Sequence, residues 1–136
     1  MTEFKSKIAE INIQANSIFN FLNDFNNFER LLPEQVTNWQ STKDNCSFTI
    51  QGMANLKLSI GAKTEYNYIS YNGEGNSPFE LSLHFYLNEK AESNTESQVI
   101  FKADLNPMLK MMASRPLKNL VDIIIDKLKE EMEKPV

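Results

Sequence analysis

The stretch from Leu105 to Leu128 reads LNPMLKMMASRPLKNLVDIIIDKL and decides the fold. When its residues are placed about 100° apart around a helix axis, the apolar ones gather on one stripe. That stripe consists of Ala113, Leu117, Leu120, Val121, Ile124 and Leu128. The opposite face is polar and consists of Arg115, Lys118, Asn119, Asp122, Asp126 and Lys129. The pattern predicts a long amphipathic helix between Asn106 and Lys134 whose apolar stripe faces a core.

Two further features of this helix bear on its packing. Ile123 and Ile125 flank the apolar stripe on both sides, which favours a concave sheet that grips the helix; self-association through one flank is the alternative. Pro107 fits the first turn, where a missing N–H breaks no bond, whereas Pro116 falls in the interior. We therefore expect a bend near Ser114 to Pro116.

A second helical stretch, Ala15 to Pro33, reads ANSIFNFLNDFNNFERLLP. Its apolar residues recur every three or four positions, which is typical of helices. We expect Asn16 or Ser17 to cap its start and Asn26–Asn27 to divide it into two short helices. Pro33 should end the second helix, because the residue before a proline avoids helical geometry.

The remaining segments alternate apolar and polar residues, which predicts strands with one buried face. Phe4 to Ile13 forms one such segment, and its change of phase near Ala9 indicates a bulge. Val36 to Leu105 accommodates six antiparallel strands separated by polar turns. Gly52 and Gly61 fall inside or beside these strands, where glycine permits bulges and strong curvature.

The predicted fold is α+β, with a curved seven-stranded antiparallel sheet (one strand, two short helices, six strands) wrapped around a long C-terminal helix. The segments Ala15 to Pro33 and Leu105 to Leu128 are similar to the opening helix pair and the closing helix of the START-like helix-grip superfamily (SRPBCC). That superfamily includes polyketide cyclase/dehydrase-like and pollen-allergen-like proteins. The resemblance implies a cavity between the closing helix and the sheet. It assigns no catalytic residue, because no catalytic motif is common to all members.

The composition of the 136 residues, 41% hydrophobic and 24% charged, fits one globular domain over residues 1–136. A net charge of −4 without a basic face argues against a nucleic-acid partner. No apolar run approaches the roughly 20 residues needed to cross a bilayer, so we expect no stable membrane insertion. Charged residues within Met1 to Ala15 do not suit a signal peptide, which leads us to expect a cytoplasmic protein.

The side chains that most often carry chemistry form no reactive constellation in the sequence. His84, the single histidine, alternates with Leu83 and Phe85, so we expect it on the outer face of its strand. Cys46 shares a face with Phe48 and is predicted to be a small buried hydrophobe. Neither has a second ligand at metal-binding spacing. We expect no metal, no cofactor and no catalytic residue.

Two clusters allow more than one interpretation. One cluster consists of Tyr66, Tyr68 and Tyr71. These tyrosines could pair across strands, or one could face a cavity and offer its hydroxyl to the polar end of a ligand. The other cluster, at the start of the C-terminal helix, consists of Met108, Met111 and Met112. Methionines suit either the mouth of a cavity or an irregular core.

We interpret the chain as a non-enzymatic carrier or sensor of a hydrophobic small molecule of a lipid, isoprenoid or polyketide kind. A long helix cannot fill a strongly bent sheet, so we expect an apolar pocket of roughly 300 to 1,000 Å³. The predicted ligand-binding residues are Phe48, Leu58, Tyr68, Leu83, Phe85, Phe101, Met108, Met112 and Leu120. Two alternatives remain open: a cyclase/dehydrase-like enzyme that uses the same cavity, and a protein-interaction module with a collapsed cavity. We expect a monomer or a weak homodimer.

Overall fold

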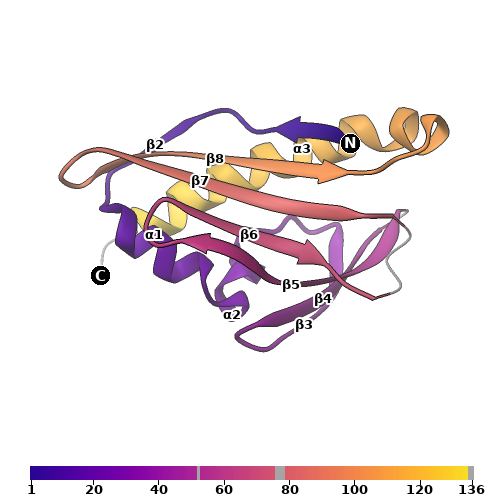
Figure 1. The fold of residues 1–136 in the computed structure, drawn as a ribbon, viewed down its shortest axis with the longest axis horizontal. Coiled ribbons are helices and arrows are strands. Elements are labelled where there is room, and N and C mark those ends of the chain that lie inside the picture. Colours follow the sequence, from indigo (N-terminus) through magenta and orange to yellow (C-terminus); the bar gives the residue numbers. More distant parts are fainter. Residues whose placement is uncertain (52, 76–78, 135–136) are drawn as a thin grey trace.

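The computed structural model describes residues 1–51, 53–75 and 79–134. Its strands form one antiparallel sheet in the order β1-β8-β7-β6-β5-β4-β3, and β2 also pairs with β8. A long helix lies along one face of this sheet (Figure 1). The elements are β1 (Thr2–Lys5), β2 (Ala9–Ile11), α1 (Ala15–Leu22), α2 (Phe25–Phe28), the 3-10 helix η1 (Glu29–Leu31), β3 (Val36–Ser41), β4 (Asn45–Ile50), β5 (Ala54–Thr64), β6 (Tyr68–Gly73), β7 (Leu81–Ala91), β8 (Asn94–Ala103) and α3 (Pro107–Met132).

The predicted helix-grip architecture is confirmed. β1 and β2 pair with successive parts of β8, so together they are one interrupted edge strand, and the sheet has seven strand positions. The interruption falls at Ser6, which lies between the two paired segments and still forms two hydrogen bonds with Val99 of β8. The Ser6 amide donates to the Val99 carbonyl at 2.9 Å, and the Val99 amide donates to Ser6 Oγ at 3.0 Å.

The helix α3 carries its apolar stripe toward the sheet as predicted. Asn106 caps its start, because the Asn106 Oδ1 accepts a hydrogen bond from the Leu109 amide at 2.9 Å. Ile125 is buried along with the stripe, which agrees with a sheet that grips the helix. Pro116 does not divide the helix, which runs as one element from Pro107 to Met132.

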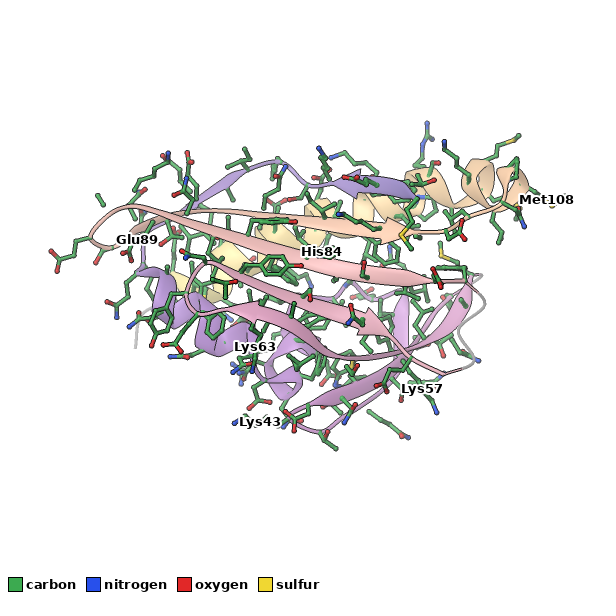
Figure 2. All side chains as sticks on the ribbon, viewed as in Figure 1. Lys43, Lys57, Lys63, His84, Glu89 and Met108 are labelled. Carbon is green, nitrogen blue, oxygen red and sulfur yellow. The ribbon has the colours of Figure 1, made fainter. Side chains whose placement is uncertain are left out.

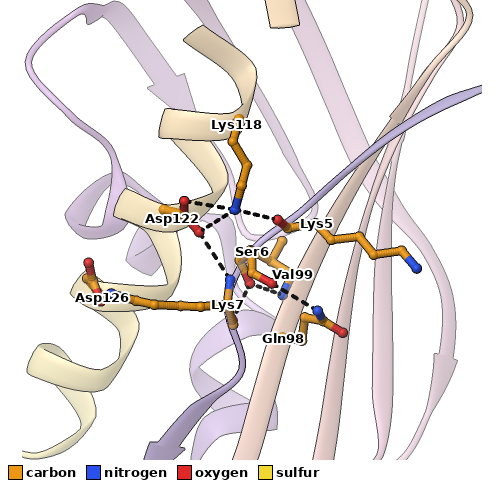
Figure 3. Close-up of polar contacts among 8 residues, drawn as sticks. All are labelled: Lys5, Ser6, Lys7, Gln98, Val99, Lys118, Asp122 and Asp126. Atoms are coloured by element: carbon orange, nitrogen blue, oxygen red, sulfur yellow. Dashed lines mark hydrogen bonds and ion pairs between the residues drawn. The ribbon is translucent and has the colours of Figure 1, made fainter. Parts of the chain in front are cut away.

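The polar face of α3 differs from the prediction at Asp122, which we expected to be solvated. Figure 3 shows Asp122 facing the break between β1 and β2. One carboxylate oxygen accepts a hydrogen bond from the Lys7 amide at 3.1 Å, and both oxygens lie within 3.0 Å of Lys118 Nζ. Lys118 also donates to the Lys5 carbonyl at 2.8 Å. The helix is thus tied by polar contacts to the interrupted edge strand.

The opening helix pair exists, but its caps lie elsewhere than predicted. Gln14, rather than Asn16 or Ser17, occupies the capping position of α1, and its side chain makes no capping bond. The Ala15 amide instead donates to the Glu89 carboxylate of β7 at 2.9 Å. The division falls at Asp24, which caps α2 by accepting from the Asn26 amide, and not at Asn26–Asn27.

Rings from α2 and the sheet fill the centre of the concavity. The Phe25 and Tyr71 ring centroids are 4.5 Å apart, and Phe28 lies 5.1 Å from Tyr71 and 6.2 Å from Phe85. The Tyr71 hydroxyl donates to the Leu22 carbonyl at 2.5 Å, which satisfies a buried polar group. This aromatic cluster is part of the buried core and leaves no exposed ring among its members.

Two bulges bend the far half of the sheet. One lies in β3 between Thr37 and Gln40, where Asn38 has a φ of 56°. The other lies in β5 between Ile60 and Lys63 and contains Gly61, as the sequence predicted. A Cβ at Gly61 would lie 2.6 Å from Asn72 Nδ2, so a larger residue would force the Asn72 side chain to move. Gly52, the other predicted bulge glycine, lies outside the described residues.

Candidate ligand-binding site

A pocket of about 400 Å³ lies beside the first half of α3. We call it the α3 pocket. One wall is the helix itself; the other comes from the η1–β3 connection, the end of β4 and the residues before β5. Its lining consists of Pro33, Gln35, Val36, Ile50, Gln51, Met53, Leu109, Met112, Ala113, Arg115, Pro116, Leu117, Asn119 and Leu120.

Backbone hydrogen bonds fix the wall opposite the helix. Pro33 follows the 3-10 helix η1, and its carbonyl accepts from the Val36 amide at 3.0 Å. The Gln51 amide donates to the Gln35 carbonyl at 3.1 Å, which extends the pairing of Val36 with Ile50. Two glutamines on adjacent chain segments therefore border the pocket at the same end.

The lining is apolar apart from a few groups. Its polar side chains are Gln35, Gln51, Arg115 and Asn119, and Arg115 is the charged one among the described lining residues. We placed Arg115 and Asn119 on the polar face opposite the stripe. Both are exposed, as that placement predicts, and they border the pocket because it extends from the stripe onto the flank of α3. An apolar hollow with a few polar groups has the character of a small-molecule site.

Two of the nine predicted ligand-binding residues, Met112 and Leu120, line the α3 pocket. Five others are buried in the hydrophobic core; they are Phe48, Leu58, Leu83, Phe85 and Phe101. Of these, Phe48 and Leu58 also border separate hollows of about 600 and 330 Å³ with many polar lining residues. Of these seven predicted ligand-binding residues, five therefore belong to the packed core and two line the α3 pocket.

The last two predicted residues, Met108 and Tyr68, lie outside the α3 pocket. Met108 is 72% exposed and projects from the start of α3 beyond the sheet (Figure 2). Tyr68 pairs with Tyr86 on the outer face of the sheet, which α3 does not cover. Of the tyrosine cluster, Tyr71 is the one that turns inward, and its hydroxyl bonds a backbone carbonyl.

His84 lies over the middle of the sheet on the outer face, as its alternation predicted (Figure 2). It is half-buried rather than freely solvated. Its Nδ1 lies 2.6 Å from the Tyr68 hydroxyl, and its Nε2 lies 2.8 Å from Ser82 Oγ. Burial lowers the pKa of His84, Lys102 lowers it further, and Glu3 opposes this. The sheet separates His84, Tyr68 and Ser82 from the α3 pocket.

The buried position of Cys46 does not suit a nucleophile. Cys46 is buried, as predicted, and burial raises its pKa to about 12 despite an opposing backbone hydrogen bond from Leu58. Within the described residues, no group of three or more His, Cys, Asp or Glu side chains could hold a metal ion. In the same part of the chain, no helix is long and apolar enough to span a membrane.

Residues 9–136 match the model of the CoxG family, whose description names a subunit of carbon monoxide dehydrogenase. The chain belongs to the CoxG family. This confirms the resemblance to the START-like helix-grip superfamily, because the CoxG family has that fold. A search of curated proteins found no match for this CoxG-family chain.

Solved structures share the fold of the CoxG-family chain at low sequence identity. KanY (ms6282) has a TM-score of 0.76 at 9% identity, with 98% of each chain covered. XoxI from Bacillus cereus has a TM-score of 0.73 at 14% identity, covering 97% of this chain and 96% of that one. A START superfamily protein from Mycobacterium smegmatis has a TM-score of 0.69 at 16% identity, covering 96% and 97%. Such likenesses show the fold alone.

Proposed function

We propose that this CoxG-family chain binds and carries a hydrophobic small molecule of a lipid, isoprenoid or polyketide kind in the α3 pocket. The main support is the pocket itself, a largely apolar space of about 400 Å³ beside α3. Its size falls in the range of roughly 300 to 1,000 Å³ that small-molecule sites occupy. Membership of a START-like ligand-binding fold family supports the same conclusion.

The chemistry of the lining favours carriage over catalysis. General acid–base chemistry uses His, Asp, Glu, Lys, Tyr or Cys side chains, and the described lining residues include none of these. His84 is on the other face of the sheet, and Cys46 is held as a thiol by burial. An open pocket also favours a ligand carrier over the interaction module with a collapsed cavity.

Thermal stability in the presence of candidate ligands tests this function. Protein freed of co-purified lipid is melted with fatty acids, isoprenoids, quinones and polycyclic aromatics in turn. A ligand that binds the native state alone adds about 2.7 kcal/mol of stability at a hundred times its dissociation constant, so the melting temperature should rise by several degrees. If no compound raises it and native mass spectrometry detects no carried molecule, the carrier function is wrong.

Two neighbouring methionines provide a matched pair of variants for locating the site. Met112 lines the α3 pocket at a 67% exposed position, whereas Met111 is 83% exposed and lies outside the described lining. We expect Met112→Lys to reduce the rise in melting temperature, because a hydrated ammonium group replaces an apolar side chain at the edge of the pocket. Met111→Lys should retain the full rise. A rise that Met112→Lys leaves undiminished would place the binding site elsewhere.

A further inference from the structure

We infer that the ligand of the α3 pocket is an amphiphile with an anionic oxygen head group, a carboxylate or a phosphate, which Arg115 binds. This inference rests on the proposed function and specifies the ligand class. The pocket joins an apolar interior to one permanently charged guanidinium, so the complementary molecule has an alkyl body and a negative end. Arg115 is exposed at the edge of the pocket, so its guanidinium is solvated until a ligand binds and can then pair with an anionic head group that stays near water.

Three of the other four cations of α3 have partners among the described residues, and the fourth, Lys110, is exposed and lies outside the described lining. Lys118 pairs with Asp122, Lys129 pairs with Glu133, and Lys127 donates to the Leu32 carbonyl at 3.1 Å. The Arg115 guanidinium forms no ion pair and no hydrogen bond within the part of the chain that the structure describes. Its charge is therefore available to a ligand.

The surroundings of Arg115 suit an anion rather than a cation. The described lining residues contain no carboxylate; Glu34, which precedes Gln35, is exposed and is not among them. The polar neighbours are side-chain amides, and Asn119 stands one helical turn after Arg115. Amide N–H groups donate hydrogen bonds to carboxylate or phosphate oxygens, and the planar guanidinium can bind two such oxygens at once.

Calorimetric titration of lipid-free protein with three ten-carbon probes tests the head group. The probes are sodium decanoate, decyl phosphate and 1-decanol, which share the alkyl body and differ in charge. We expect at least one anionic probe to bind about tenfold more tightly than decanol, since hydrogen bonds to charged groups are worth about 1.5 kcal/mol or more. The preference should shrink as salt is added.

Variants of the two arginines assign the effect to the residue. Arg115→Gln should bring the affinities of all three probes within about twofold of one another and leave decanol binding unchanged. Arg115→Lys should keep part of the preference, because it retains the charge but loses the two-pronged geometry. Arg30→Gln is the matched control, since Arg30 is exposed on η1 and outside the lining, and it should behave as the wild type.

The outcomes separate this inference from the proposed function. If none of the probes binds the wild-type protein, the carrier function and the head-group assignment both fail. If decanol binds as tightly as the anionic probes, the pocket binds alkyl ligands and only the head-group inference is wrong. If the anionic preference persists in Arg115→Gln, another group recognises the head and the assignment to Arg115 is overturned.

Discussion

The Asp122 carboxylate of α3 accepts a hydrogen bond from the Lys7 backbone amide, 115 residues earlier in the chain. Lys7 lies in the break between β1 and β2, where its N–H has no strand partner. The helix therefore supplies the acceptor that the sheet lacks at this point (Figure 3). Burial raises the pKa of Asp122, but the bonds from Lys118 and Lys7 outweigh burial and leave the pKa below its ordinary value.

We predict that Asp122→Ala lowers the free energy of unfolding by about 1 kcal/mol, since it removes bonds to an amide and an ammonium group at a partly exposed site. Chemical denaturation at pH 7 measures this. Because the pKa is depressed in the folded state, its stabilisation is fully present above the ordinary value of 3.8, and the difference from the wild type should shrink as the pH falls from there through the lowered pKa.

Asp126→Ala is the control for that variant. Asp126 forms an exposed ion pair with Lys7 Nζ at 2.6 Å, and such pairs contribute about 0.5 kcal/mol or less. Equal losses for Asp122→Ala and Asp126→Ala would contradict a special role for the amide bond.

We predict that Tyr71→Phe destabilises the fold by about 1 to 2 kcal/mol, because it leaves the Leu22 carbonyl without its buried donor. Burial raises the pKa of Tyr71 well above its ordinary value, with Cys46 and Asp24 contributing, so the phenol stays protonated as a donor. Tyr66→Phe, at a 42% exposed position, should change stability by less than about 0.5 kcal/mol. Urea denaturation of both variants measures these losses, and equal midpoints would contradict a stabilising hydrogen bond from Tyr71 to the Leu22 carbonyl.

Glu89 acts as the cap of α1 from another element, and Glu89→Ala should cost about 1 kcal/mol, the usual loss when a helix cap is removed. The effect should appear as faster amide hydrogen exchange in the first turn of α1. Glu92→Ala, in the β7–β8 turn, serves as the control and should leave that exchange unchanged. Unaltered protection of α1 in Glu89→Ala would show that the helix start needs no external cap.

His84 predicts a pH effect on stability at mildly acidic pH. Its pKa lies below the ordinary value of 6.5, so above pH 6.5 both the folded and unfolded states carry the neutral ring. As the pH falls below 6.5, the unfolded state takes up the proton first and stability is lost. We expect a shallower decline for His84→Gln over the same range, measured as unfolding free energy against pH. Parallel curves would rule out His84 as the source.

Periodicity was sufficient to predict the architecture, because a buried stripe or face imposes its spacing on the sequence directly. The stripe of α3 and the alternation around His84 are such cases. Contacts between distant segments leave no comparable signal. The acceptor for the Tyr71 hydroxyl is a backbone carbonyl, and the cap of α1 comes from Glu89, so neither could be predicted from local pattern.

The candidate site was predictable only in part, for a geometric reason. The ligand was expected between the closing helix and the concave sheet, and rings of Phe25 and Phe28 fill part of the inner face by packing against Tyr71. The space that remains lies along the flank of α3. Arg115 is exposed, as the helical projection predicts, and it also borders this space. Helix periodicity gives the direction of a side chain but not where the neighbouring loops end.

The two irregular edges of the sheet also affect the tendency of the protein to aggregate at high concentration. An intact edge strand presents a row of free N–H and C=O groups that can template pairing with another chain and lead to aggregation. One edge here is interrupted at Ser6, whose amide is bonded to Val99, and the other is bent by the bulge at Asn38. Neither edge offers a long straight template, so the sheet resists growing from molecule to molecule into fibrils.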